Sequence, residues 1–132
     1  MTTIQYSRDY DNVYSPAIPV ADIVLVNPYT GEKSSTFTAI IDSGADGSIM
    51  PSSILKFSEL DEARRIRMVG VGGVSQIMNR YWVNIEIGKA SVRGIMVMAD
   101  KSNNEAIIGR DVLNQLVVKL DGLAQITEIS DE

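Results

Sequence analysis

The sequence predicts a mainly β protein, a closed barrel or folded sheet with one short helix near its C-terminal end. Many short apolar runs rich in β-branched residues are separated by turn-forming residues, a pattern typical of strands. Only residues 110–116 show helical spacing of apolar side chains. The chain has 132 residues, of which 45% are hydrophobic, enough for one domain with a core. We expect a single domain over residues 17–132, preceded by a flexible N-terminal arm of residues 1–16.

The first predicted element is a hairpin over residues 18–41. Residues 20–26 form a β-branched run, typical of a strand. Residues 27–31 read Asn-Pro-Tyr-Thr-Gly, which indicates a turn. Residues 35–41 then return as the second strand.

A second, longer hairpin is predicted farther along the chain. Residues 66–71 and 75–87 read as its strands, and the glycines around residues 70–73 mark a flexible tip. Before it, residues 51–60 favour a short helical turn; after it, residues 92–99 favour another strand. This part of the chain therefore adds at least three strands to the sheet.

The C-terminal part predicts a short strand, the helix and a third hairpin. Residues 106–109 form a brief apolar run that ends in glycine. Val112, Leu113 and Leu116 have the spacing of one helix face. Residues 117–129 then read as a hairpin whose turn is Asp121-Gly122.

Composition excludes several classes of function. The chain has no cysteine and no histidine, so thiol nucleophiles, thiolate zinc sites and triads with an imidazole base are excluded. The net charge of −5 argues against nucleic-acid binding. Neither a signal peptide nor an apolar run of ~20 residues is found. We expect a cytoplasmic protein that binds no membrane, metal or cofactor.

Asp42 is the main candidate for chemistry. It follows two β-branched residues, Ile40 and Ile41, at the end of a predicted buried strand, where partial desolvation disfavours a charged carboxylate. A solvated aspartate in an ordinary turn is the alternative interpretation. A calcium loop starting at Asp42 fails, because its third position is Gly44 and its twelfth is Ser53.

Three separated motifs, in this order, resemble the retroviral aspartic protease family. They are Asp42-Ser43-Gly44-Ala45-Asp46, the glycine-rich residues 68–73, and residues 107–113, which read Ile-Ile-Gly-Arg-Asp-Val-Leu. The similarity covers roughly residues 18 to 130. It implies a retropepsin-like barrel that assembles as a two-fold homodimer.

The resemblance also implies a role for each matching residue. Asp42 corresponds to the catalytic aspartate, Ser43 to the hydroxyl residue that braces the two active loops, and Arg110 to the arginine that pairs with Asp46, in a geometry that could be bidentate. The positions implied in substrate binding are Gly44, Ala45, Asp46, Ile49, Ile107 and the flap residues Gly70, Val71 and Gly72. Ile40 is a further side-pocket position, and like the other apolar positions it could equally belong to the core. The C-terminal hairpin departs from the single terminal strand of the viral enzymes.

The resemblance implies the activity of an aspartic protease, and the single Asp-Ser-Gly motif implies that two chains are needed for it. Aspartic protease chemistry uses two carboxylates that share one proton, so a second copy of the chain must supply the other Asp42. The sequence thus predicts an aspartic endopeptidase that cleaves extended polypeptide segments as a homodimer. The alternative is a catalytically idle retropepsin fold that serves dimerisation or peptide binding.

Overall fold

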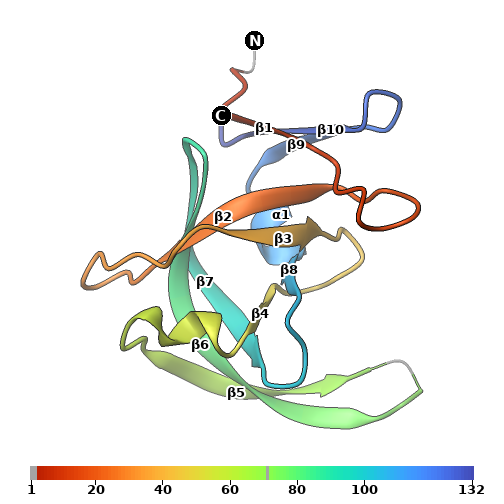
Figure 1. Ribbon diagram of the computed structural model, residues 1–132. Helices are drawn as coiled ribbons and strands as arrows, with labels where there is room; N and C mark the ends of the chain where they lie inside the picture. Colours follow the sequence, from red (N-terminus) through yellow and green to blue (C-terminus); the bar gives the residue numbers. More distant parts are fainter. Residues whose placement is uncertain (1–2, 71) are drawn as a thin grey trace.

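The computed structural model describes residues 3–70 and 72–132 and, within them, the side chains outside residues 64–66. The protein is mainly β, as the sequence predicts (Figure 1). Its elements are β1 (Tyr6–Asp9), β2 (Val20–Val26), β3 (Phe37–Ile41), β4 (Ile49–Pro51), the 3-10 helix η1 (Ile54–Phe57), β5 (Glu62–Val69), β6 (Ser75–Ile87), β7 (Ala90–Asp100), β8 (Ala106–Ile108), α1 (Arg110–Leu113), β9 (Val117–Asp121) and β10 (Ile126–Ser130).

The central feature is a closed barrel of six strands. Seven strands are hydrogen-bonded in the order β2-β3-β8-β4-β7-β6-β5, and β2 also pairs with β6. That last pairing closes the ring and leaves β5 outside it, where, among the described strands, it pairs with β6 alone. Closure pairs each of the six barrel strands with a neighbour on both sides, so β5 keeps the free edge of this sheet. The retropepsin-like barrel predicted from the sequence is therefore confirmed.

The three predicted hairpins are present, with one difference in the last turn. β2 pairs with β3, β5 with β6 and β9 with β10, each antiparallel. Asp121 is the final residue of β9, opposite Ile126, so the connection is the four residues 122–125 instead of a two-residue Asp-Gly turn. Asp121 Oδ1 accepts a hydrogen bond from the Ala124 N–H (3.0 Å), which explains why an aspartate suits the start of this longer loop.

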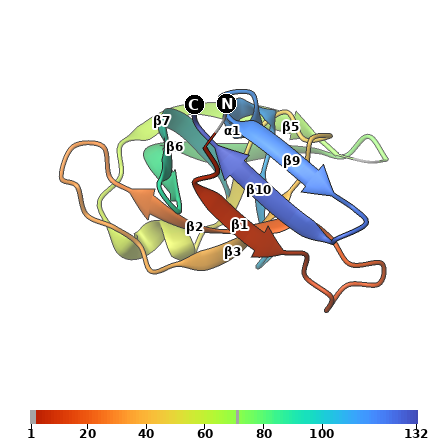
Figure 2. The same cartoon turned by 90° about the horizontal axis from the view of Figure 1, so that it is seen from above.

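The N-terminal segment differs from the flexible arm expected from the sequence, because Tyr6–Asp9 forms β1. This strand pairs antiparallel with β10, giving a small sheet of order β1-β10-β9 above the barrel (Figure 2). The pairing joins residues more than a hundred positions apart, so local sequence carries no signal for it.

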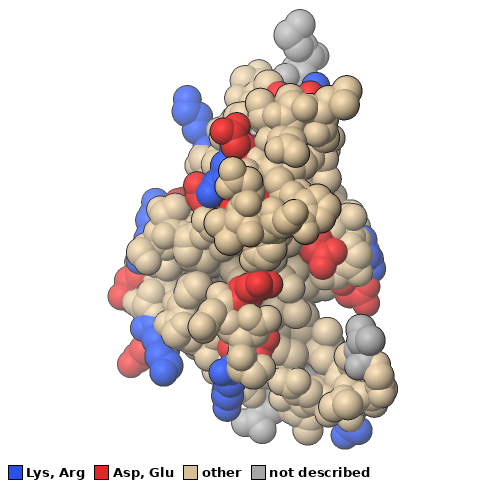
Figure 3. Space-filling view, turned by 45° about the vertical axis from the view of Figure 1, so that its right-hand side comes forward, with Lys and Arg blue, Asp and Glu red and all other residues tan. Residues whose placement is uncertain are grey.

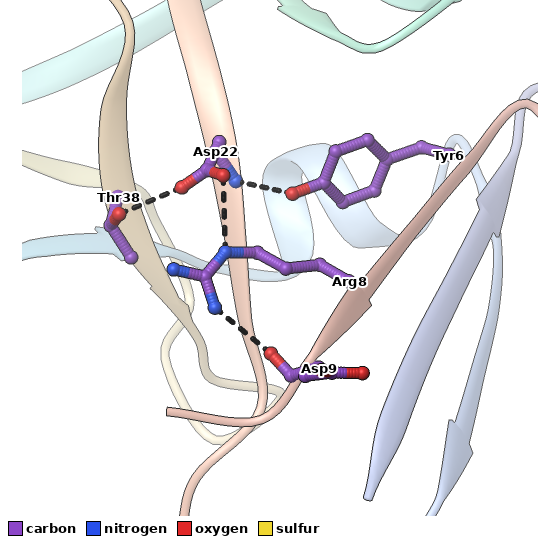
Figure 4. A network of polar contacts seen from close by, with 5 residues as sticks. All are labelled: Tyr6, Arg8, Asp9, Asp22 and Thr38. Carbon is purple, nitrogen blue, oxygen red and sulfur yellow. Dashed lines mark hydrogen bonds and ion pairs between the residues drawn. The ribbon is translucent and has the colours of Figure 1, made fainter. Parts of the chain in front are cut away.

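Side chains of β1 also fasten the small sheet to the barrel through Asp22 of β2 (Figure 4). The Asp22 carboxylate accepts hydrogen bonds from Arg8 Nε (3.1 Å) and Thr38 Oγ1 (2.7 Å), and its backbone N–H donates to the Tyr6 hydroxyl (2.7 Å). Burial raises the pKa of Tyr6. The small sheet and the barrel thus form one packed unit.

Buried apolar residues fill the barrel. Ile23, Leu25, Met50, Ile85 and Val97 are fully inaccessible to solvent. Strand residues that alternate with them face outward, which is the period of two expected for strands. In the part of the chain described, no helix is long and apolar enough to span a membrane.

Candidate active site

Two parallel neighbouring strands position the Asp42 loop. β3 and β8 run parallel, with Ile41 opposite Ile108, so the chain leaves both strands at the same end of the sheet (Figure 1). The Asp42 N–H donates to the Ile108 carbonyl (3.0 Å), which continues the ladder one residue past β3. The loop after β3 and the segment that opens α1 therefore meet at one place.

The Asp42 carboxylate is oriented by its own loop and is partly exposed. Its Oδ1 accepts the Gly44 N–H (2.9 Å), and its backbone carbonyl accepts the Ala45 N–H (3.2 Å). A Cβ at Gly44 would lie 3.1 Å from Oδ1, so glycine allows this close approach of backbone to carboxylate. Among the described residues, no side chain from another segment donates a hydrogen bond to this carboxylate.

Arg110 braces the loop from the start of α1. One guanidinium nitrogen, Nη1, donates to the Ser43 carbonyl (2.7 Å), and the other, Nη2, donates to Asp46 Oδ1. Its backbone N–H donates to the Ala45 carbonyl (2.9 Å). The pairing with Asp46 predicted from the sequence is present but is not bidentate, because the guanidinium divides its two donors between Asp46 and the backbone of Ser43.

A second brace lies deeper and was not identified from the sequence. The fully buried Ser48 donates its N–H (2.9 Å) and its hydroxyl (2.7 Å) to the two oxygens of Asp111. The Ser48 Oγ in turn accepts the Gly109 N–H (3.0 Å). The sequence signal for this contact is that Ser48 directly precedes the apolar Ile49-Met50 run. A serine at that position is expected to be buried, and a buried polar group needs hydrogen-bond partners.

At Gly109 the segment that opens α1 comes very close to the backbone of the Asp42 loop. A Cβ there would lie 2.7 Å from the Gly47 carbonyl oxygen and 2.9 Å from that of Ala45. Both are backbone atoms, which a side-chain rotation cannot move away. Glycine is therefore required for α1 to pack against the Asp42 loop.

Three predicted side-pocket residues form one row beside the loop. Ile40 of β3 lies opposite Ile107 of β8, and Ile107 lies opposite Ile49 of β4. All three are partly exposed, whereas the alternate residues Ile41, Ile108 and Met50 are buried in the barrel. The structure thus brings Ile40, Ile107 and Ile49 together on the face of the sheet opposite the core.

The β5–β6 hairpin carries the predicted flap residues. The Gly70 N–H donates to the Val74 carbonyl (2.9 Å), and Gly72 and Gly73 have positive φ angles of 88° and 78°, which glycine adopts readily. Val71 lies outside the described residues. Around the tip, Val69 is 68% exposed, Val74 72% and Ile77 63%, so the hairpin presents apolar side chains to solvent.

Charge on the face drawn in Figure 3 is mixed. Acidic side chains lie near its middle, and Lys and Arg side chains are scattered mostly toward its edges. Such a surface does not concentrate positive charge as a site for phosphate groups does.

Asp42, Asp46 and Asp111 differ in the hydrogen-bond partners of their carboxylates. Both oxygens of Asp111 accept hydrogen bonds from Ser48, and Asp46 pairs with Arg110. Asp42 alone among these three is held only by its own backbone loop and is partly exposed. Of these three carboxylates, Asp42 is therefore the one that other segments of the described chain leave without a partner.

Comparison with known proteins agrees with this geometry. The family model described as retroviral aspartyl protease matches residues 18–121. A retropepsin-like aspartic protease from Rickettsia conorii is similar in fold, with a TM-score of 0.51 and 13% identity over 85% of this chain and 92% of that one. The EIAV protease in complex with an inhibitor has a TM-score of 0.49 and 19% identity over 74% of this chain and 86% of that one. A comparison with curated protein sequences found no significant match.

The family match covers the Asp42 loop, the β5–β6 hairpin and the Arg110 segment, and the structure joins the first and the last of these through the hydrogen bond from Arg110 to the Ser43 carbonyl. This chain belongs to the retroviral aspartyl protease family, whose members are aspartic peptidases.

Proposed function

We propose that the protein is an aspartic endopeptidase that hydrolyses extended polypeptide segments with water activated by Asp42. The observation that carries the proposal is the partly exposed Asp42 carboxylate, whose acidic neighbours Asp46 and Asp111 are already paired. Neither neighbour is free to act as the second carboxylate of the reaction. A second copy of the chain, related by a two-fold axis, supplies that group from its own Asp42.

Chemistry in this arrangement requires the two carboxylates to share one proton. Like charges a few Å apart do not both ionise, so the pair titrates as a unit with two separated apparent pKa values. The ionised carboxylate removes a proton from water as the water attacks the scissile carbonyl. The protonated one hydrogen-bonds to the carbonyl oxygen, and a proton then passes to the leaving amine.

An extended peptide fits between the Asp42 loop and the β5–β6 hairpin, which we interpret as the flap. In the part of the chain that the structure describes, β5 pairs only with β6, so its other edge can accept an added strand. Side chains of the peptide that point toward the barrel would contact the row formed by Ile40, Ile49 and Ile107. Burial of Val69, Val74 and Ile77 on closure would favour apolar substrates.

The β9–β10 hairpin is the surface that best suits the second copy. β9 is the last strand of its sheet, and Val117 (50%), Leu120 (47%) and Leu123 (102%) are exposed on or beside it. Pairing of β9 edges from two copies would satisfy backbone groups and bury these side chains. The hairpin that departs from the viral pattern would thereby join the interface.

The second candidate function is a catalytically idle fold that binds peptide or mediates dimerisation. The exposed apolar flap favours peptide binding whether or not cleavage follows. The two candidates differ in turnover alone.

Cleavage of a diverse peptide library at several pH values distinguishes them. We expect the wild-type protein to cleave within extended apolar segments, with a bell-shaped pH dependence and with inhibition by a statine-type transition-state mimic. Binding without cleavage, at concentrations where the protein is dimeric by sedimentation, would instead support the idle module.

Replacing Arg110 with lysine is expected to reduce activity more than stability. Lysine keeps the charge but has one ammonium group, which cannot reach both the Ser43 carbonyl and Asp46 in the manner of a guanidinium. The pair is exposed, with Asp46 at 89%, so the free energy of unfolding should fall by no more than about 1 kcal/mol. We expect kcat/KM to fall about tenfold because the loop loses its alignment. Equal activity of the two proteins, measured beside thermal unfolding, would contradict a bracing role.

A further inference from the structure

A pocket of about 360 Å³ lies between η1, β6 and the end of β7 (Figure 1). We call it the lysine pocket, after Lys56 on η1 and Lys101 in the loop that follows β7, which both border it. The described residues that line it include none from the loop of residues 42–48, which carries Asp42. The lysine pocket is therefore separate from the candidate active site.

The charged side chains that line the lysine pocket are both positive, although the chain as a whole has a net charge of −5. Lys56 and Lys101 are exposed at its border. In the part of the chain that the structure describes, neither ammonium group forms an ion pair or a hydrogen bond. Two unpaired cations beside one cavity favour an anionic occupant.

Carboxylates on neighbouring segments do not cancel this charge inside the pocket. Glu32 accepts the Ser58 hydroxyl (2.8 Å), and Asp100 accepts the Ser102 hydroxyl (2.9 Å). Glu62 lies opposite Tyr81 in the β5–β6 pairing but does not line the pocket. The positive side chains therefore face a cavity without an acidic lining residue.

Two uncharged polar side chains of the pocket are also available to a ligand. Asn79 and Tyr81 are half-buried and lie on the same face of β6 as the buried Val83. Within the described residues, neither the Asn79 amide nor the Tyr81 hydroxyl makes a hydrogen bond to another protein group. Both groups can donate to an acceptor in the pocket.

Ser52, in the turn after β4, carries a buried polar group that the fold leaves unused. Its hydroxyl oxygen is inaccessible to solvent and has no hydrogen-bond partner among the described residues, and the residue lines the pocket. An unsatisfied buried hydroxyl costs free energy, and native proteins contain few of them. Rotation about the Cα–Cβ bond redirects a serine hydroxyl, so an acceptor in the pocket would supply the missing partner.

The remaining walls of the pocket are apolar. Leu55 is 7% exposed and belongs to the barrel core, and Leu60 and the Tyr81 ring pack against that core. A ligand that covers these side chains gains from the removal of apolar surface from water. The occupant therefore needs an apolar body in addition to an anionic group.

We propose that the lysine pocket binds a small organic carboxylate with an aromatic or branched aliphatic body. The carboxylate accepts hydrogen bonds from Lys56 and Lys101, and the body covers the leucines and the Tyr81 ring. Inorganic phosphate fits less well because it has no apolar part. This inference goes beyond the proposed peptidase and does not depend on it.

A matched pair of probes tests the class of ligand. 2-Naphthoate and 2-naphthamide have nearly the same shape, but only the first is charged. We expect isothermal titration calorimetry to show one naphthoate bound per chain, with an affinity at least about tenfold above those of naphthamide and inorganic phosphate. Naphthoate should also raise the thermal unfolding temperature in proportion to its occupancy.

Charge reversal locates the site. Lys56→Glu and Lys101→Glu each replace an attraction by a repulsion and should weaken naphthoate binding by about tenfold. The control is Lys89→Glu, which makes the same change of net charge at an exposed residue in the turn between β6 and β7 and should keep the wild-type affinity. Thermal unfolding without ligand establishes that each variant is folded.

Ser52→Ala separates a binding role of this hydroxyl from a structural one. Because the hydroxyl has no partner in the described chain, we expect its removal to leave the unfolding temperature unchanged or higher. Naphthoate should bind this variant several-fold more weakly. A lower unfolding temperature with wild-type affinity would show that the hydroxyl serves the fold, and would remove Ser52 from the site.

Three results would overturn the lysine pocket as a carboxylate site. They are equal affinity for naphthoate and naphthamide, wild-type naphthoate affinity in folded Lys56→Glu and Lys101→Glu, and an equal loss of affinity in Lys89→Glu. Asp42→Asn should bind naphthoate as the wild type does. Loss of binding in that variant would place the ligand at the candidate active site instead.

Discussion

Replacing Asp42 with asparagine is expected to reduce peptide cleavage by about 10⁴-fold or more, the largest effect of any single substitution in this chain. Asparagine has the same shape, and its amide oxygen can still accept the Gly44 N–H. It does not take a proton from water, and in a two-fold dimer the one change removes both carboxylates. The measurement is kcat/KM on the best library peptide, with peptide affinity measured in parallel.

Structure and binding should survive this substitution. We expect the thermal unfolding temperature of Asp42→Asn to stay within a few degrees of the wild type and its dimer to persist. The matched control is Asp121→Asn, which changes an aspartate in the β9–β10 connection whose role as a hydrogen-bond acceptor asparagine can fill. Wild-type cleavage rates in Asp42→Asn would exclude Asp42 as the catalytic residue.

The same variant tests whether the active site is shared. Excess Asp42→Asn mixed with the wild type should inhibit it, because most wild-type chains then pair with a chain that lacks the second carboxylate. The wild type alone should also lose specific activity on dilution below the dimer dissociation constant. Activity that is simply additive in the mixture would show that each chain acts alone.

Replacing Asp111 with alanine is expected to give the largest loss of stability among the site residues. The change leaves the N–H and the hydroxyl of the fully buried Ser48 without their acceptor. Hydrogen bonds to a charged acceptor contribute about 1.5–3 kcal/mol each, so the free energy of unfolding should fall by about 3 kcal/mol. For a domain of this size, this corresponds to a decrease of roughly 10–15 °C in the unfolding temperature.

Activity should fall in Asp111→Ala as well, even at temperatures where the variant is folded. The Ser48 contact holds the end of the loop that begins at Asp42, and small misplacements of catalytic groups can cost about 10²-fold in rate. Asp111→Asn retains one acceptor oxygen and should show an intermediate loss of stability. A double-mutant cycle with Ser48→Ala measures the coupling directly, and strictly additive effects would contradict the interaction.

Local sequence patterns predict most of the strands and the helix. The β-branched runs and the glycine turns predict the β2–β3 and β5–β6 hairpins because both strands and their connection lie close together in sequence. The expected helix over residues 110–116 is correct in place but ends at Leu113, since residues after it enter a turn before β9. The strand β1 was missed because its partner β10 lies at the other end of the chain.

For the candidate site, the sequence alone determined which residue types are present and in what order. An aspartate after an apolar strand makes Asp42 the main candidate, and the resemblance to the retroviral aspartic protease family implies the role of Arg110. The lack of cysteine and histidine excludes thiol and imidazole chemistry. Only the tertiary structure decided how Asp42 and Arg110 are held. The parallel pairing of β3 with β8 brings residues more than sixty positions apart into hydrogen-bond contact. Burial of Ser48, its bonds to Asp111 and the contact at Gly109 depend on that pairing, because sequence spacing cannot specify distances between separate segments.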